Sequence, residues 1–536
     1  MADAQIARLC TQIINSHFGP LSAKVAEALL TLGRLPVPHI VRATGLRPRT
    51  VRATLLVLLQ HNVLWYALDP IDGEVLEISP EECMLRLRFG RAVWQAGQLF
   101  GQSGSDIVQM VLDHGKLRPP DIVPGCRRPT RKAAVHRQVL HKLVTLAYLK
   151  PSTAKRHLSP RDKAIKYELE EKAKISGFPT AKEVREAKEA AETRLKREED
   201  EDASCGMKRK AKEQNGHRPS KIRDDVYFRV NFDKFNTHIR NQVKKAARER
   251  FNEGAATVMR AVLKATESTQ TSLNDERSDP ASIGNIILQV ADDADLTSGL
   301  VVSSSKTSKS TCTKHYLDLL ACADNPTNEA ARLPSSPTAR KSRRSDVCSR
   351  RRPGETRDNG LRVVRLLLGG GKLDEKQVAR GVMLPAKDVR ALLAALAADS
   401  LVSTQEVPKT ATGIRLGRST SGAHVDETKA YAMLLGELYK TLYNIGVRRQ
   451  AEQEEPMVRA VLEKRQRSDV RADEGLLTRL DREILAEWER KEEKLTVLEM
   501  RVEECVFLCA TSACWARRRV EIGAELRPNS SRAAFV

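Results

Sequence analysis

The sequence contains no long hydrophobic run. The longest runs, Leu55 to Leu59 and Val363 to Leu368, are far shorter than the ~20 apolar residues that a membrane-spanning helix needs. The first residues include Asp3 and Arg8 and lack the continuous apolar core of a secretory signal. The 10 cysteines are scattered over 536 residues, too thinly for a disulfide scaffold. We therefore expect a soluble, intracellular protein with free thiols and no membrane partner.

The motifs of enzymes and metal sites are missing as well. Gly369 to Lys372 lacks the spacing of a phosphate-binding loop, and Leu373 stands where a magnesium-binding Ser or Thr would be. Cys505, Cys509 and Cys514 contain no C-x2-C pair. The histidines form no H-E-x-x-H motif. We therefore predict a non-catalytic protein with no cofactor, no metal and no small-molecule substrate.

Positive charge is in excess. Lys and Arg number 91 against 69 Asp and Glu, so the formal net charge is +22 and the sequence pI is about 9.6. Such a surplus favours polyanionic partners, of which nucleic acid is the commonest. Hydrophobic residues make up 41% and charged residues 30%, which suits several small cores together with charged, unpacked stretches.

A winged helix is predicted near the beginning of the chain. Two helices separated by Gly19-Pro20 come first, and a short helix then ends at Gly45, which suits a left-handed cap. The next helix, which is the third of the winged helix itself, covers residues 48–61 and has an apolar stripe. Two strands, 63–68 and 74–78, are joined by a turn with an Asp-Gly pair. Three helices followed by a β-hairpin are the pattern of a winged helix.

The pattern is repeated later in the chain. Val51-Arg52-Ala53 is echoed by Val389-Arg390-Ala391, and in both copies an apolar pair follows 12 and 13 residues after the Val. Helices at 361–368 and 375–382 precede the second copy. A looser third copy is predicted from Asp106 to Leu149. The chain is therefore expected to contain tandem winged helices.

Two regions have a different composition. Residues 155–223 are rich in Lys, Arg, Glu, Asp and Ala, which indicates a solvated helix or a disordered insertion. From Ala430 to Phe507 the composition is helical, interrupted by Pro456 and Gly475, and we predict a hairpin coiled coil that binds other proteins. Its expected seam includes Met433, Leu434, Leu438, Leu442 and Ile445. The end of the charged region is a candidate nuclear localisation signal, with a solvated charge run as the alternative; its residues are Lys208, Arg209, Lys210, Lys221 and Arg223.

Basic residues at the predicted third helices are candidate DNA contacts. Arg47, Arg49 and Arg52 stand at the start and on the outer side of the first of these helices, where a winged helix meets phosphates or base edges. Lys387 and Arg390 hold comparable places in the last copy. A solvated basic surface is the alternative interpretation for all five.

Several motifs, in their order along the chain, resemble one family. They are His17-Phe-Gly19, Asn231-Phe-Asp-Lys-Phe235, Glu375-Lys-Gln-Val378, Met383-Leu-Pro-Ala-Lys387 and Gln405-Glu-Val-Pro-Lys-Thr410. Together they resemble the winged-helix subunit of eukaryotic RNA polymerase III that is related to the alpha subunit of TFIIE. The likeness covers most of residues 1–154, 224–266 and 361–508, and it ends after Ala510.

The resemblance implies a fold and a set of partners. The implied fold has four winged helices, a charged insertion in the second and a C-terminal coiled coil on the polymerase clamp. The implied partners are two subunits of a TFIIE-like heterotrimer, the clamp of the largest subunit, the initiation factor TFIIIB and promoter DNA. The implied role, in the nucleus, is promoter opening and initiation at transfer RNA, 5S RNA and similar genes. A free-standing basic winged-helix DNA-binding regulator, or a winged-helix scaffold of another complex, is the alternative.

The sequence thus predicts a mainly α protein with small β-hairpin wings, in which tandem winged-helix (helix-turn-helix) modules precede a C-terminal helical coiled coil. We number the winged helices modules 1 to 4. The expected boundaries are 1–82 for module 1, 83–154 and 224–255 for module 2, 155–223 for the insertion, 256–334 for a divergent module 3, 335–358 for a Ser- and Arg-rich linker, 359–425 for module 4, 426–510 for the coiled-coil hairpin and 511–536 for an unstructured tail.

Overall fold

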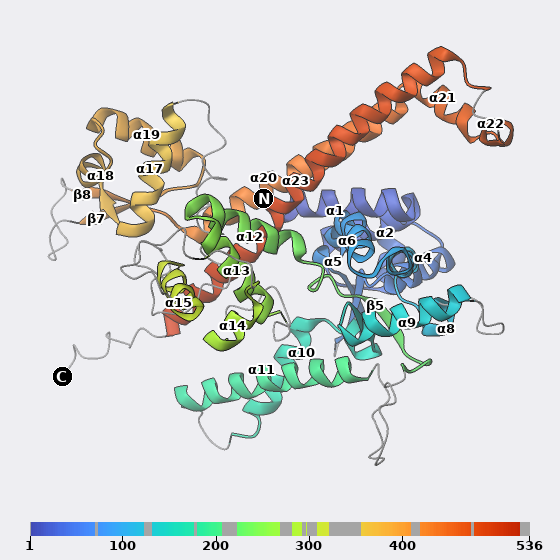
Figure 1. Ribbon diagram of the computed structural model, residues 1–536, viewed down its shortest axis with the longest axis horizontal. Helices are drawn as coiled ribbons and strands as arrows, with labels where there is room; N and C mark the ends of the chain where they lie inside the picture. Colours follow the sequence, from blue (N-terminus) through green and yellow to red (C-terminus); the bar gives the residue numbers. More distant parts are fainter. Residues whose placement is uncertain are drawn as a thin grey trace. The chain divides into compact units, whose positions relative to one another are not determined.

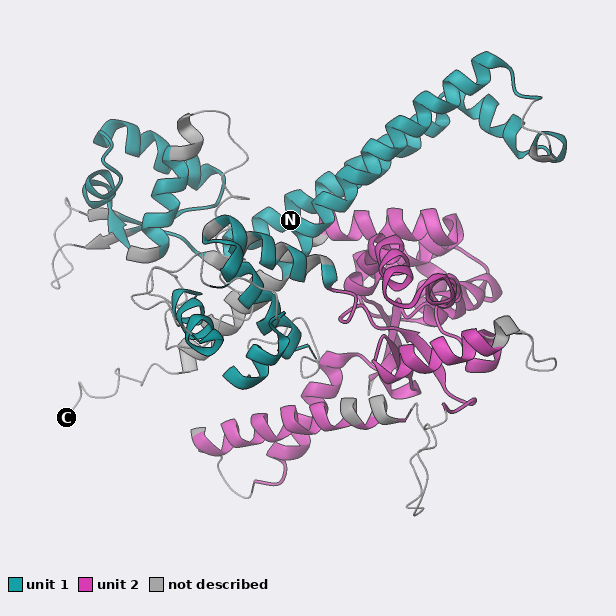
Figure 2. Ribbon diagram, in the orientation of Figure 1, with its two compact units in different colours: residues 1–2, 237–536 teal, residues 3–236 magenta. Residues whose placement is uncertain are grey.

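The computed structural model describes most of the chain and divides it into two compact units. The units comprise residues 3–236 and residues 237–536 together with the first two residues (Figure 2). The protein is mostly helical with small antiparallel sheets, which confirms the predicted fold class. Within the described part, no helix is long and apolar enough to cross a membrane. The described residues are 2–69, 73–122, 131–175, 180–205, 222–267, 281–291, 296, 308–320, 355–408, 419–472 and 476–525.

Module 1 is a winged helix, as predicted. Its strands form an antiparallel sheet in the order β1-β3-β2, and β2 and β3 are the wing. The fully buried side chains of Val25, Ile40, Val51 and Leu58 join its three core helices. An additional helix, α1, precedes them (Figure 1). The elements are α1 (Ala2–Phe18), α2 (Pro20–Leu32), β1 (Leu35–Pro36), α3 (Val37–Thr44), α4 (Pro48–Gln60), β2 (Leu64–Asp69) and β3 (Gly73–Ile78).

Module 4 repeats this topology element for element. Its strand order, β6-β8-β7, matches β1-β3-β2. The turn before each third helix has a residue with positive φ, Gly45 in module 1 and Met383 in module 4, and the turn after it has Asn62 and Ser400. The elements are α17 (Glu355–Gly370), β6 (Leu373–Asp374), α18 (Glu375–Val382), α19 (Ala386–Ala398), β7 (Ser403–Pro408) and β8 (Ser419–His424).

Module 2 has the same plan with the insertion placed in its wing. Leu117 forms an isolated bridge with Phe228 on β5, and β5 pairs with β4, so the order of module 1 recurs. The chain between β4 and β5 is the insertion. The elements are α6 (Phe89–Phe100), α7 (Gln102–His114), α8 (Pro119–Ile122), α9 (Arg131–Thr145), β4 (Leu149–Ser152) and β5 (Tyr227–Val230); α5 (Pro80–Met84) and the 3-10 helix η1 (Leu85–Arg88) lead into it from module 1.

The described part of the insertion is helical, which is the first of the two alternatives, solvated helix or disorder, that its composition left open. After the 3-10 helix η2 (Ala154–His157), α10 (Pro160–Lys172) and α11 (Ala181–Ser204) lie against each other. The Tyr167 hydroxyl donates to Glu198 Oε2 at 2.6 Å, and Arg194 pairs with Glu170 at 2.7 Å. Ala187 on α11 is buried. Opposite charges paired between the helices, and small buried residues, explain why so polar a sequence is ordered.

Module 3 begins earlier than expected. Residues 224–255 were expected to belong to module 2, but Val243 and Ala247 of α12 pack into one core with Val258 and Tyr316. The boundary therefore lies between Asn236 and Thr237. The described elements of this module are the helices α12 (Thr237–Arg250), α13 (Glu253–Ala265), α14 (Ile283–Gln289) and α15 (Lys309–Leu320). Of the expected linker, residues 335–354 lie outside the described residues.

A helical arm follows module 4. Helices α20 and α23 run side by side, and Arg449 of α20 bonds to Glu492 and Glu499 of α23 at 2.7 and 2.8 Å. Ala430, near the start of α20, belongs to the core of module 4. The expected unstructured tail from residue 511 is wrong in part, because α23 continues to Glu525 and no proline interrupts it. The elements are α20 (Glu427–Glu454), α21 (Pro456–Gln466), α22 (Ser468–Ala472) and α23 (Arg479–Glu525).

Candidate nucleic-acid interface

The turn before α4 places Arg47 at the helix start. Gly45 has a φ of +66°, the left-handed conformation that glycine adopts most easily, and its N–H donates to the Val41 carbonyl. Pro48 opens α4 with its fixed φ, and Arg47 is the extended residue immediately before it. The backbone of Arg47 is thus held by a tight turn on one side and a helix on the other.

The outer side of α4 is uniformly basic in charge. The inner side buries Val51 and Leu58, which turns Arg49 and Arg52 towards solvent. Among the described residues, neither these two nor Arg47 has an ion-pair partner. The chain also has no Asp or Glu between Glu27 and Asp69. We call Arg47, Arg49 and Arg52 the α4 surface; it can attract phosphate groups without competition from nearby carboxylates in sequence.

The equivalent surface of module 4 is different. Arg390 donates to Glu375, with Nη2 at 2.9 Å from Oε1 and Nε at 3.2 Å from the same oxygen. This hydrogen bond to Glu375 raises the pKa of the Arg390 guanidinium above its ordinary value. Lys387 is exposed beside the equally exposed Asp388. The positive charges of Lys387 and Arg390 are therefore nearly balanced by the nearby carboxylates of Asp388 and Glu375.

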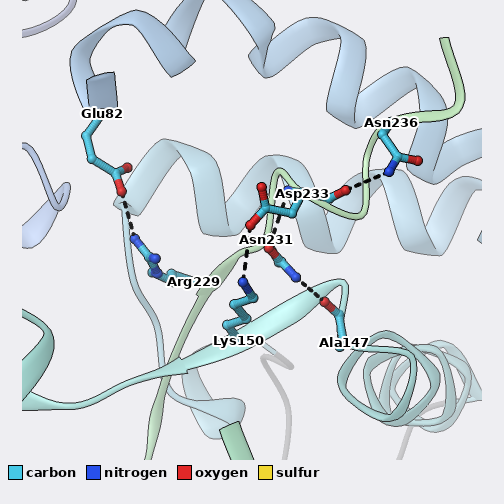
Figure 3. Close-up of polar contacts among 7 residues, drawn as sticks. All are labelled: Glu82, Ala147, Lys150, Arg229, Asn231, Asp233 and Asn236. Carbon is cyan, nitrogen blue, oxygen red and sulfur yellow. Dashed lines mark hydrogen bonds and ion pairs between the residues drawn. The ribbon is translucent and has the colours of Figure 1, made fainter. Parts of the chain in front are cut away.

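Polar contacts explain the motif Asn231 to Phe235 where the chain returns from the insertion. Asn231 donates through Nδ2 to the Ala147 carbonyl at 2.8 Å, and Asp233 pairs with Lys150 at 3.3 Å (Figure 3). Asn236 donates to the Asp233 carbonyl at 2.9 Å. These bonds hold the segment after β5 against the turn before β4, so the sheet closes although the insertion separates its strands.

Contacts with module 2 fix the position of α4. Gln60, the last residue of α4, donates through Nε2 to the carbonyls of His114 and Lys116 at 3.1 and 2.7 Å. Gly115 lies between them, so close that a Cβ there would meet the Gln60 carbonyl oxygen at 2.4 Å. Burial, together with the charge of Arg86 and two other histidines, lowers the pKa of the neighbouring His61 to about 4. Modules 1 and 2 are thus joined by the Gln60 side chain, which donates to two backbone carbonyls, and by the close approach of Gly115 to the backbone of Gln60.

The insertion also holds the wing of module 1. Ser159 N–H donates to the Tyr66 carbonyl on β2 at 3.3 Å, and Leu158 bridges to the same residue. Arg34 bonds to both carboxylate oxygens of Asp162 at 2.9 Å and pairs with Glu77 of β3 at 2.8 Å. The wing of module 1 is therefore bound to the insertion, within the same compact unit that contains the α4 surface.

One set of exposed basic residues was not predicted from the sequence, although the helix that carries them belongs to the predicted third copy. In module 2, α9 holds the third-helix position, and Arg137, Gln138 and Lys142 on it are exposed. The signal was present in the sequence, because no Asp or Glu occurs between Asp121 and Asp162.

The remaining predicted site lies mostly beyond the described part of the chain. Of the candidate nuclear localisation signal, residues 208–210 and 221 lie outside the described residues. Arg223 is exposed and pairs with Asp225 at 3.2 Å.

The repeated fold defines a tandem winged-helix protein, in which the third helices of modules 1 and 2 expose basic side chains. Two family models identify it further. A model described as the RNA polymerase III subunit RPC82 helix-turn-helix domain matches residues 8–69, and one described as RNA polymerase III subunit RPC82 matches residues 138–404. The chain belongs to this family of non-catalytic subunits of RNA polymerase III, so its partners are other polymerase subunits.

Similar proteins cover most of the chain. DNA-directed RNA polymerase III subunit RPC3 of Bos taurus is 26% identical over 95% of this chain and 98% of its own length. The Homo sapiens protein of the same name is also 26% identical, with the same coverage. The Danio rerio protein of that name is 23% identical over 94% of this chain and 97% of its own length.

Proposed function

We propose that this subunit acts in the nucleus in promoter opening and transcription initiation at transfer RNA, 5S RNA and other small RNA genes. The observation that carries the proposal is the α4 surface, whose guanidinium groups have no ion-pair partner among the described residues, in a protein that belongs to the RPC82 family. Arginines at a helix start suit phosphate contacts, which position a protein on DNA without reading its sequence.

The rigid mounting of the α4 surface supports this role. Opening a promoter needs the duplex to be held in a fixed place relative to the polymerase while its strands separate. Gln60 and Gly115 tie α4 to module 2 through backbone groups, so the three guanidinium groups move with a unit of more than two hundred residues. A force exerted on DNA bound at the α4 surface would thus act on the whole of this compact unit and not on one helix alone.

The other parts of the chain are proposed to bind protein. Module 4 has paired charges on its third helix, which suits a protein contact better than a phosphate contact. The arm of α20 and α23 is proposed to form the coiled coil that docks on the clamp of the largest subunit. Two further subunits would complete a TFIIE-like heterotrimer, and TFIIIB and promoter DNA are proposed partners during initiation.

Promoter opening can be measured separately from RNA synthesis. Polymerase III purified through this chain, either wild type or carrying Arg47→Ala, Arg49→Ala and Arg52→Ala, is assembled on a transfer RNA gene. Unpaired thymines then report opening, and transcription from a template with a pre-opened bubble reports catalysis. We expect the triple variant to lose opening on the duplex and to transcribe normally from the bubble.

A matched control removes three positive charges elsewhere in the same unit. Lys166→Ala, Lys182→Ala and Lys196→Ala lie on the exposed sides of α10 and α11 and should leave opening unchanged. Normal opening by the α4 triple variant would contradict the proposed role. Purification of the chain with DNA but without polymerase would favour a free-standing regulator instead.

A further inference from the structure

Helix α9 of module 2 occupies the place of a DNA-reading helix. It is followed by Ala147, which has a φ of +58° as Asn62 has +60° after α4, and then by the sheet of Leu117, β5 and β4. Its inner side packs on α7 and β4, burying Leu140 and Leu143. The opposite side faces away from this core, as the outer side of α4 does.

The outer side of α9 carries side chains with hydrogen-bond donors and positive charge. Arg137, Gln138, His141 and Lys142 have the spacing that places residues on one side of a helix. Arg137, Gln138 and Lys142 are exposed, and His141 is half-buried. The stretch between Asp121 and Asp162 contains ten Lys and Arg residues and no carboxylate side chain. The segment that contains α9 therefore brings positive charge and no carboxylate of its own to this part of module 2.

We propose that α9 binds duplex DNA in the major groove, as a second contact beside the α4 surface. Arg137 and Lys142 would contact phosphates or guanine edges, and Gln138 can bond to an adenine edge. Duplex RNA is the poorer fit, because its deep and narrow major groove does not admit a helix. Between the α4 surface and the end of that helix, the exposed residues include Ala53 and Leu56, which have no hydrogen-bonding side chain, so α9 has the fuller set.

This inference extends the proposed function and rests on it for its biological setting, but it concerns other residues and is tested separately. The full chain is titrated with a labelled short DNA duplex, and anisotropy is followed at several salt concentrations. The variant Arg137→Ala with Lys142→Ala should bind about tenfold more weakly, and the slope of log affinity against log salt should fall by about 2.

Two further variants separate charge from folding. Lys166→Ala with Lys182→Ala removes the same charge from the insertion and should bind within about twofold of wild type. Arg137→Lys with Lys142→Arg keeps both charges and should keep the salt slope of the wild type. Loss of binding by the charge-keeping variant as well would mean that α9 was merely disturbed, and would overturn the proposal.

Equal binding by Arg137→Ala with Lys142→Ala and by its charge control would overturn the proposal. So would a loss confined to a labelled RNA hairpin, which would assign α9 to RNA. If the α9 variant weakens binding and the α4 triple variant does not, the α4 role fails and the α9 site stands; the reverse result rejects α9 alone.

Discussion

Modules 1 and 4 have the same backbone plan and different surfaces. Both order their strands alike, and both place residues of positive φ before and after the third helix. In module 1 the outer side of that helix carries Arg49 and Arg52 without ion-pair partners among the described residues. In module 4 the corresponding Arg390 forms an ion pair with Glu375. The apolar stripe on the inner side of the third helix therefore determines the fold of a winged helix, whereas the charged residues on its outer side can differ between modules that share the fold.

The two modules also differ in how they are held. Module 1 is tied to module 2 by Gln60 and Gly115, and its wing is held by Ser159 and Arg34. Module 4 instead shares its core with the beginning of α20 through Ala430. A winged helix can therefore be fixed either by a neighbouring module or by the next helix along the chain.

The largest effect is expected when the tie between modules 1 and 2 is broken. In Gly115→Ala the new Cβ would meet backbone atoms of Gln60 and His61 at 2.4 and 2.8 Å, and φ is +80°. We expect the contact to be weakened by about 3 kcal/mol. The measurement is loss of hydrogen-exchange protection in α4 and α7.

The control for this prediction is Gly33→Ala, at the same place in module 1. Its φ is +87°, but a Cβ there would meet nothing within 4 Å. It should cost only about 1 kcal/mol, from backbone strain. Equal losses in the two variants would show that the close approach at Gly115 does not hold the modules.

The charge difference between the modules predicts unequal DNA binding. Arg47→Ala with Arg49→Ala and Arg52→Ala should weaken binding of the full chain to a short duplex by on the order of 100-fold at low salt. Lys387→Ala with Arg390→Ala should change it by less than about threefold, because Arg390 is already paired. Anisotropy titrations measure both, and a larger effect from module 4 would reverse the assignment.

Acid should loosen the unit of modules 1 and 2. Burial, followed by nearby positive charge, lowers the pKa of His61 and of His157 to about 4, against an ordinary value of 6.5. Between these values the unfolded state binds more protons than the folded one, so stability falls as the pH falls from 6.5 towards 4. By pH 5 the loss should be about 1 kcal/mol for each histidine, after allowance for solvent.

Hydrogen exchange of α4, with the amides of α19 as the internal reference, measures this loss. The variant His61→Gln with His157→Gln should flatten the pH dependence. An unchanged dependence in that variant would show that other groups are responsible.

A backbone exchange between the modules should have a smaller effect. Met383 has a φ of +59° and is 91% exposed, so Met383→Gly removes strain and loses almost no packing. It should stabilise module 4 by about 0.5 kcal/mol, and Gly45→Met should destabilise module 1 by about 1 kcal/mol. Local exchange protection in α19 and α4 measures the two, and a loss of protection in Met383→Gly would contradict the comparison.

The smallest effect should make module 4 resemble module 1. Glu375→Gln removes the carboxylate that pairs with Arg390 and keeps a polar side chain of similar size. DNA affinity of the full chain should rise about twofold, with a steeper salt dependence. Glu489→Gln, on the arm, is the charge-matched control, and equal gains in both variants would show a general charge effect.

Some elements were predictable because their signals are local. The repeated Val-Arg-Ala marked both third helices, since an apolar stripe at helical spacing must face a core. Gly45 and Pro48 marked the turn between helices for equally local reasons. The order of the insertion was not predictable in this way, because the pairing of Tyr167 with Glu198 joins two separate helices.

The winged helices and the starts of their third helices could thus be read from local patterns, since the spacing of apolar, glycine and proline residues sets them within a few turns of chain. The folded structure was needed to show that β5 returns to β4, that Gly115 meets Gln60, and that Arg390 is paired while the α4 surface has no ion pair among the described residues. Those outcomes depend on contacts between residues that are separated in sequence, and local sequence patterns do not specify which of these residues will meet in the folded protein.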